Sequence, residues 1–221
     1  MSERASAILQ GPEFGPAAGG APQKLVILLH GLGADGMDLI GLAPELAEAA
    51  PNAVFVSPNA PQRCDMAPMG YQWFSLLDRS GPAILAGVQA SAPILDAYIS
   101  EQRDRFGLKD CDVALLGFSQ GTMMSLYVAP RREKALAGVM GFSGRLIGPE
   151  LLEADLRSRP PILLVHGDAD PIVPVESSED AEALLSNLGF ETELLIRPHL
   201  PHGIDREGID AAAAFLRRIW G

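Results

Sequence analysis

Short runs of apolar residues alternate along the chain with longer stretches in which apolar residues recur every three or four positions. The short runs predict β-strands at Lys24–Leu29, Ala53–Val56, Asp112–Leu116, Ala137–Phe142, Pro161–Val165 and Glu191–Ile196. Several of these runs are apolar at nearly every position, which is typical of strands that are covered on both faces of a sheet.

The longer stretches predict helices between the strands, at Asp38–Ala50, Ile84–Phe106, Gln120–Val128, Glu176–Leu188 and Asp205–Ile219. Pro93 lies inside the second of these stretches, where it cannot donate a backbone hydrogen bond, so we expect a kink or two abutting helices there. Strands that alternate with helices in this way favour an α/β fold, with an open, mostly parallel sheet and right-handed crossovers.

The length of 221 residues fits a single domain over residues 1–221. Apolar residues make up 48% of the chain and charged residues 20%, which excludes a disordered, collagen-like or coiled-coil protein. We expect residues 1–23 to form a loop or a frayed edge strand. Residues 57–81 form a long irregular stretch, and its large apolar side chains argue against disorder.

Charge and cysteine content limit the classes of partner and the cell compartment that we expect for this protein. Seventeen Lys and Arg against 28 Asp and Glu give a net charge of −11, which disfavours a nucleic-acid partner. The N-terminus lacks the apolar stretch of a signal peptide, and the longest apolar runs, Leu25–Leu29 and Val113–Leu116, are too short for stable membrane insertion. Only Cys64 and Cys111 are present, which favours reduced thiols in a cytoplasmic protein.

The strongest motif is Gly117-Phe118-Ser119-Gln120-Gly121, a G-x-S-x-G pentapeptide between a predicted strand and a predicted helix. A sharp turn between strand and helix lifts a serine hydroxyl above the edge of the sheet. The start of the following helix offers unpaired N–H groups to a developing oxyanion. A plain turn that caps the helix is the alternative, but the context favours Ser119 as a nucleophile.

A serine nucleophile needs a base, and the base needs an acid that orients it. In this type of fold the chain order is Ser, then Asp or Glu, then His, which excludes His30 and His166 as the base. Two loops qualify, because each follows one of the last two predicted strands. Asp170 is the predicted acid in the first loop, and Asp168 is the alternative.

His202 is the predicted base in the second loop, because it sits close to the start of the last helix and is followed by the flexible Gly203. His199 lies between two prolines and is assigned to loop packing. The Gly-rich turn at residues 30–33 follows the first strong strand, where an oxyanion loop belongs. We therefore expect the backbone N–H groups of Leu32 and Gln120 to bind the oxyanion.

Taken together, these motifs resemble the acyl-protein thioesterase/carboxylesterase family, also called phospholipase/carboxylesterase, within the α/β-hydrolases. The matching segments, which span Leu25 to Asp205, are LVILLHGLGADG, FVSPNAP, QWFSLLD, LLGFSQGTMMSLY, LVHGDADPIVP and PHGID. The resemblance implies an α/β-hydrolase fold and a triad of Ser119, Asp170 and His202. It also implies oxyanion donation by Leu32 and Gln120.

For the acyl chain, the stretch of residues 57–81 is the expected wall, with Trp73, Phe74 and Met66 as candidates. Leu32 and Val173 are expected to flank the nucleophile. Aromatic and methionine side chains also build cores, so the core remains the alternative for each of them. The sequence shows neither zinc-ligand spacing nor an oxygen-rich calcium loop, so we expect no metal and no cofactor.

The leading hypothesis is a serine carboxylesterase that acts on small to medium acyl esters through an acyl-enzyme. The alternative enzyme is an acyl-protein thioesterase or a lysophospholipase that acts on long acyl chains. A catalytically silent α/β-hydrolase scaffold that binds a ligand is the remote alternative. The expected partner is a small ester or thioester, and the sequence leaves open a homodimer and a role for Cys64.

Overall fold

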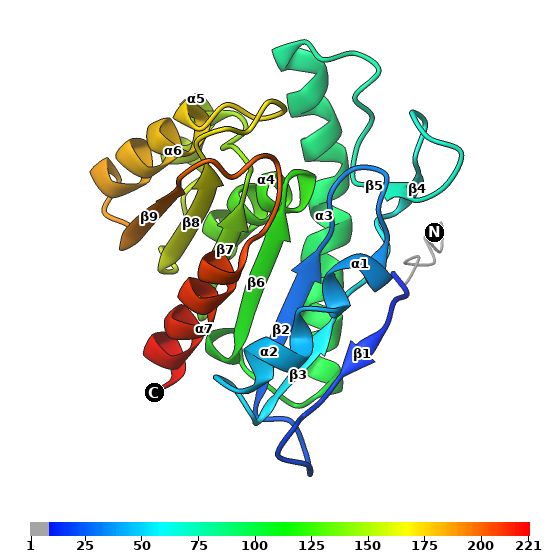
Figure 1. The fold of residues 1–221 in the computed structure, drawn as a ribbon, viewed down its shortest axis with the longest axis vertical. Coiled ribbons are helices and arrows are strands. Elements are labelled where there is room, and N and C mark those ends of the chain that lie inside the picture. Colours follow the sequence, from blue (N-terminus) through cyan, green and yellow to red (C-terminus); the bar gives the residue numbers. More distant parts are fainter. Residues whose placement is uncertain (1–8) are drawn as a thin grey trace.

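A mostly parallel sheet forms the middle layer of the protein (Figure 1). The computed structural model describes residues 9–221, and within them seven strands pair in the order β1-β3-β2-β6-β7-β8-β9. These strands are β1 Glu13–Phe14, β2 Lys24–Leu29, β3 Ala53–Val56, β6 Val113–Phe118, β7 Gly138–Phe142, β8 Ile162–Gly167 and β9 Thr192–Arg197. All neighbours are parallel except β1, which pairs antiparallel with β3 at one edge.

The helices flank this sheet on both faces (Figure 1). They are α1 Gly36–Ile40, α2 Ala43–Ala47, α3 Gly81–Arg105, α4 Gln120–Val128, α5 Pro149–Asp155, α6 Glu176–Asn187 and α7 Arg206–Trp220, with 3₁₀ turns at Asp110–Asp112 and Ala129–Arg131. The fold is that of an α/β-hydrolase, as predicted.

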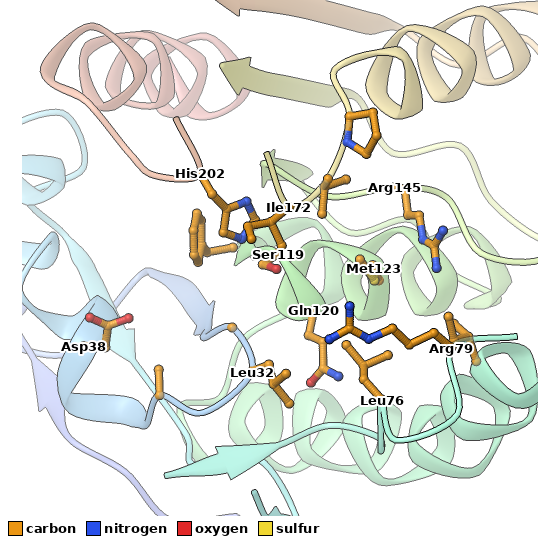
Figure 2. A pocket seen from close by; sticks show the side chains of 16 residues that line it. Leu32, Asp38, Leu76, Arg79, Ser119, Gln120, Met123, Arg145, Ile172 and His202 are labelled. Atoms are coloured by element: carbon orange, nitrogen blue, oxygen red, sulfur yellow. The ribbon is translucent and has the colours of Figure 1, made fainter. Parts of the chain in front are cut away.

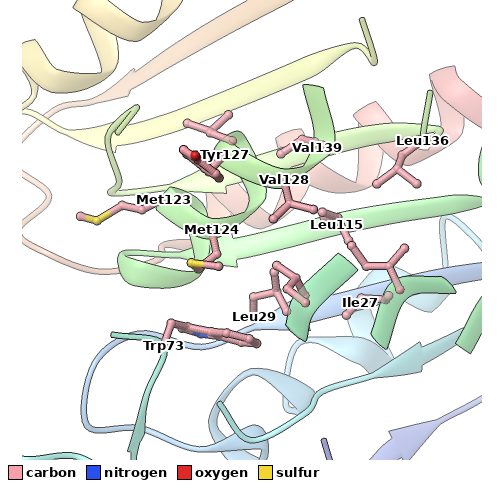
Figure 3. Close-up of a cluster of buried hydrophobic side chains, with 14 of the residues drawn as sticks. Ile27, Leu29, Trp73, Leu115, Met123, Met124, Tyr127, Val128, Leu136 and Val139 are labelled. Carbon is pink, nitrogen blue, oxygen red and sulfur yellow. The ribbon is translucent and has the colours of Figure 1, made fainter. Parts of the chain in front are cut away.

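Alternation along the strands explains the two layers, because successive side chains point to opposite faces of a sheet. In β2, Leu25, Ile27 and Leu29 belong to the core shared with α3, α4, α5 and α6. Val26 and Leu28 belong to the core shared with α1, α2 and α7. Figure 3 shows the first core, in which Ile27 and Leu29 of β2 belong to one cluster with Leu115 of β6, Met124 of α4 and Val139 of β7.

The structure corrects two of the helix predictions and contains one helix that the sequence did not predict. The stretch Asp38–Ala50 is two short helices, α1 and α2, because the chain breaks at Gly41 and Pro44 lies in the first turn of α2. Helix α3 continues through Pro93 as one element, so two abutting helices are wrong. Pro93 is exposed, and there solvent can bind the carbonyl that the proline leaves without a donor. Helix α5 was not predicted.

The structure describes most of the two segments that were predicted to be irregular, residues 1–23 and residues 57–81. Glu13 and Phe14 pair with Val56 and Phe55, so the N-terminal segment supplies a two-residue edge strand, while residues 1–8 lie outside the described part. In the stretch of residues 57–81, β4 Gln62–Arg63 and β5 Tyr71–Gln72 form a small antiparallel hairpin. This long loop is therefore an ordered excursion from the carboxyl end of β3.

Helix α3 is long and apolar enough, by length and composition alone, to cross a bilayer. In this protein its Ile84, Val88 and Ile99 are buried in the core, and the helix packs against α4. A core helix passes the same test of length and composition.

Candidate active site

Ser119 stands at a strained turn between β6 and α4. Its backbone angles are φ 54° and ψ −113°, a region that residues with a side chain rarely adopt. The flanking positions have no room for larger residues. A Cβ on Gly117 would lie 2.4 Å from the Thr122 nitrogen, and one on Gly121 would lie 1.8 Å from the Leu29 oxygen. The two glycines of the G-x-S-x-G motif therefore let the turn pack against β2 and the start of α4.

Hydrogen bonds to the neighbouring strand hold this turn in place. The Ser119 N–H donates to the Phe142 carbonyl at the end of β7, at 2.9 Å. The hydroxyl of Thr122 lies 2.7 Å from the Gly117 oxygen and 2.8 Å from the Phe142 oxygen. Because β6 and β7 end at the same edge of the sheet, these bonds fix the height of the serine above that edge.

Asp170 lies in the loop after β8, with its side chain fully buried. One carboxylate oxygen accepts the N–H groups of Ile172 at 2.8 Å and Val173 at 3.0 Å, and the other lies 2.7 Å from His202 Nδ1. Burial alone would raise the pKa of Asp170. The hydrogen bonds from His202 and the two amides together outweigh it, so the pKa lies below its ordinary value and the group stays ionised.

Asp168, the alternative acid, is engaged elsewhere. Its carboxylate accepts the backbone N–H of His199 at 2.6 Å, so these two residues hold the loops after β8 and β9 together. His199 itself is in the left-handed region, with φ 60°. Asp168 and His199 thus form a loop brace beside the Asp170–His202 pair.

His202 lies on the loop after β9 and is partly buried, with its ring against Phe118 at a centroid distance of 4.8 Å. Because Nδ1 faces the Asp170 carboxylate, Nε2 is the nitrogen free to take a proton. His202 and Ser119 line one cavity, and Figure 2 places them next to each other. In residues 9–221 no hydrogen bond joins the His202 ring to the Ser119 hydroxyl; such bonds often tighten only in a substrate complex.

The two expected oxyanion donors line the same cavity. Among the described residues, neither the Leu32 N–H nor the Gln120 N–H donates to a protein acceptor. Gln120 begins α4, so its N–H is one of those that a helix leaves unpaired, and it adds the positive end of the helix dipole. Both amides are therefore available to an oxygen that develops negative charge beside Ser119.

The cavity around Ser119 has a volume of about 420 Å³. Its apolar wall comes from six elements or loops and consists of Leu32, Leu76, Ile84, Phe118, Met123, Ile172, Val173 and Pro174. Val173 was expected here, and the structure brings it to the cavity. Leu76, Ile84 and Met123 were not expected, because their distances along the chain give no sign that they share one wall.

The other three expected wall residues lie elsewhere, which corrects that expectation. Trp73 and Phe74 are fully buried in the core and do not line the cavity, as Figure 3 shows for Trp73. Met66 lies on the hairpin loop between β4 and β5, exposed to solvent and away from the cavity. Trp73 lies in the core, where its backbone N–H and its indole N–H both have buried hydrogen-bond partners.

Hydrogen bonds of Trp73 and Gln120 connect the two segments that carry the candidate oxyanion donors. The Trp73 indole N–H donates to the His30 carbonyl at 3.0 Å, one residue before the Gly31-Leu32 turn. The Gln120 side chain accepts the Trp73 N–H at 3.0 Å and donates to the Phe74 carbonyl at 2.8 Å. This network ties the loop that carries Leu32 to the start of α4, and sequence reasoning had no signal for it.

Three charged residues also line the cavity, namely Asp38, Arg79 and Arg145. Figure 2 shows Asp38 on one side of Ser119 and the two arginines on the other. Sequence reasoning missed all three. Arg145 carried a usable signal, because it follows β7 by three residues and so falls at the edge of the sheet where Ser119 lies.

The described part of the chain contains neither a metal-binding group of side chains nor a disulfide. Between residues 9 and 221, no group of three or more His, Cys, Asp or Glu residues is arranged to hold a metal ion. Cys64 and Cys111 are both free thiols.

Comparison with known proteins gives a consistent family. A family profile described as Phospholipase/Carboxylesterase matches residues 16–220. The crystal structure of esterase PE8 is 45% identical, with a TM-score of 0.91 over 96% of this chain and 99% of that chain. Acyl-protein thioesterase 1 of Gibberella zeae is 28% identical over 87% of this chain and 89% of its own length.

A further relative carries a different name. The "Probable inactive carboxylesterase" of Oryza sativa subsp. japonica is 26% identical over 92% of this chain and 88% of its own length. The names of these relatives thus include an esterase, a thioesterase and a protein described as inactive.

Proposed function

The chain belongs to the phospholipase/carboxylesterase family of α/β-hydrolases, and from this premise we propose that it is a serine carboxylesterase for small to medium acyl esters. One observation carries the proposal: His202 Nδ1 lies 2.7 Å from the fully buried Asp170 carboxylate. The His202 ring lines the same cavity as Ser119. A buried carboxylate that orients an imidazole beside a serine is the arrangement that activates a hydroxyl.

The first half of the reaction makes the acyl-enzyme. The Ser119 oxygen attacks the ester carbonyl carbon while His202 Nε2 takes the hydroxyl proton. The carbonyl electron pair moves to the oxygen, where the N–H groups of Leu32 and Gln120 stabilise it. When the tetrahedral intermediate collapses, the bond to the leaving oxygen breaks and His202 gives its proton to the alcohol. Asp170 stabilises the imidazolium between these two transfers.

The second half releases the acid by the same chemistry with water as the nucleophile. His202 takes a proton from water, the resulting oxygen attacks the acyl carbon, and Ser119 leaves as the reprotonated alcohol. Apart from the substrate and water, every reacting group in these steps is supplied by the chain. The free thiols of Cys64 and Cys111 support a reducing, cytoplasmic setting for this reaction.

A long-chain acyl-protein thioesterase or lysophospholipase is the second candidate function. The apolar wall of the cavity and the relationship to acyl-protein thioesterase 1 favour it. A series of aryl esters and acyl thioesters of increasing chain length separates the two. Preferred turnover of short esters supports the carboxylesterase, and preferred turnover of long thioesters supports the second candidate.

A fluorophosphonate probe tests the proposal itself, because it reacts only with an activated serine. We expect stoichiometric labelling of Ser119 in the wild-type protein and none in Ser119→Ala, with the folded state of the variant checked by circular dichroism. A folded wild-type protein that neither reacts with the probe nor hydrolyses any ester would contradict the proposal. It would favour a silent ligand-binding scaffold instead.

A further inference from the structure

Two cations of the active-site cavity have no partner for their charge among the described residues. Arg79 is exposed on the loop before α3, and Arg145 is half-buried on the loop after β7. Within residues 9–221, no carboxylate oxygen lies within 4.0 Å of either guanidinium group, and neither group donates a hydrogen bond to a protein acceptor. Most other described arginines are paired: Arg131 contacts Asp155, for example. Because Arg79 and Arg145 line the same cavity, their two unpaired guanidinium groups can bind an anion there.

The two arginines lie on one particular side of the nucleophile. Figure 2 shows Arg79 and Arg145 on the same side of Ser119, with Met123 and Leu76 close by, whereas His202 and Asp38 lie on the opposite side. The general acid must be next to the oxygen that leaves. In the proposed reaction the alcohol therefore departs on the His202 side, and the acyl group extends toward the arginines.

We propose that the acyl group of the substrate carries a carboxylate, which Arg79 and Arg145 bind at the far end of the cavity. The substrate class is the half-ester of a dicarboxylic acid, whose methylene groups would contact Leu76, Ile84 and Met123 on the way. A guanidinium group matches a carboxylate because its N–H donors form a planar fork. Asp38 at the other end disfavours an anionic alcohol by repulsion. This inference rests on the proposed esterase function and names its substrate.

A matched substrate series tests the inference with the intact protein. Ethyl half-esters of straight-chain dicarboxylic acids of increasing length are compared with analogues in which the free carboxylate is a carboxamide. At the best chain length, we expect kcat/KM to favour the carboxylate by about tenfold to a hundredfold, the range of a hydrogen bond to a charged group. The preference should shrink as salt is added, because one of the two arginines is exposed.

Variants then assign the preference to the two side chains. Arg145→Gln should lower the ratio of carboxylate to carboxamide turnover more than Arg79→Gln, because a half-buried charge is less screened by solvent than an exposed one. The double variant should bring the ratio close to one. Arg217→Gln is the matched control: Arg217 is an exposed arginine on α7 with no ion pair to described residues, so its variant should keep the wild-type ratio.

The outcomes separate this inference from the proposed function. Equal turnover of carboxylate and carboxamide esters, with normal probe labelling of Ser119, overturns the inference and leaves the esterase standing. A preference for esters whose carboxylate is on the alcohol side overturns the assignment of the arginines to the acyl group. A wild-type ratio in the double variant overturns it as well. A protein that is neither labelled nor active on any ester overturns both.

Discussion

The Nε2 atom of His166 lies 3.3 Å from the Asp170 oxygen that also lies 2.7 Å from His202 Nδ1, so two histidines flank one carboxylate. His166 is fully buried; its Nε2 also lies 2.9 Å from the Val173 carbonyl, and its Nδ1 lies 2.6 Å from the Ser178 hydroxyl. A carbonyl and a carboxylate only accept, so the ring proton belongs on Nε2 and Ser178 donates to Nδ1. His166 is thereby a structural support for the Asp170 loop.

Replacing His166 should therefore cost stability as well as turnover. His166→Ala leaves the buried Val173 carbonyl without its donor and leaves the Ser178 hydroxyl only its long contact to the Gly144 carbonyl, at 3.5 Å. This should lower the free energy of unfolding by about 1–3 kcal/mol. It should also lower kcat, because the Asp170 loop loses its inner contact. Urea denaturation and ester hydrolysis measure the two effects. His166→Gln, which can still donate to the Val173 carbonyl, is the control and should recover part of both. A His166→Ala variant with wild-type stability would contradict the assigned hydrogen bonds.

The sequence predicts the frame of the site well, for reasons that are local. The six long strands are recognisable because parallel strands buried on both faces are apolar at nearly every position. Ser119 is recognisable because its two flanking glycines have no substitute at their close contacts with Thr122 and Leu29. The helix break at Gly41 was missed because apolar periodicity continues across it.

The part that the sequence could not predict depends on the tertiary structure. Trp73 reads equally well as a cavity wall or as core, and only its hydrogen bond to the His30 carbonyl decides for the core. Arg79 and Arg145 come from loops that are 66 positions apart in the sequence numbering (145 − 79), and no periodicity connects them. Such a pair becomes visible only when the fold brings both loops to the rim of one cavity.

The roles of the two aspartates in the loop after β8 can be separated by matched substitutions. Asp170→Asn should lower kcat by about 10⁴-fold, the size of the effect when the acid of a serine triad is made neutral. Asp168→Asn should change kcat little, because Asp168 holds the His199 backbone and does not contact His202. Steady-state hydrolysis of one aryl ester measures both, with circular dichroism as the check on folding. A larger loss in the Asp168 variant would show that the acid is misassigned.

The Trp73→Phe substitution tests whether Trp73 supports the Leu32 loop or contacts the acyl chain of the substrate. The substitution keeps the aromatic packing but removes the indole N–H, so the buried His30 carbonyl loses its partner and the Leu32 loop loses one anchor. We expect kcat to fall by about tenfold, in line with the roughly 1–3 kcal/mol cost of an unpaired buried group. The same factor should apply to short and long acyl esters, because Trp73 does not line the cavity. If the substitution instead raised KM, and raised it more for longer acyl chains, Trp73 would be part of the wall that contacts the acyl chain.

His30 should make the stability of the protein depend on pH near neutrality. Its Nε2 accepts the Ala60 N–H at 3.0 Å, so this nitrogen carries no proton, and Nδ1 lies 2.7 Å from the Gly31 oxygen. Burial lowers the pKa of His30 below its ordinary value of 6.5, and the Gly31 hydrogen bond and two nearby carboxylates only partly offset this. The folded protein therefore holds the neutral ring below the pH at which the unfolded chain takes up a proton.

The sign of the effect follows from proton linkage. Below pH 6.5 the unfolded state binds more protons at His30 than the folded state, so the free energy of unfolding should fall as pH falls toward the lowered pKa, and should not change through His30 above 6.5. The aspartates with lowered pKa, such as Asp170, lose their contribution only at lower pH, as pH falls from 3.8 through their folded values. Urea denaturation between about pH 5 and 8 isolates the histidine window. His30→Asn should lose this slope, because it cannot titrate, and an unchanged slope in that variant would assign the pH dependence to another histidine.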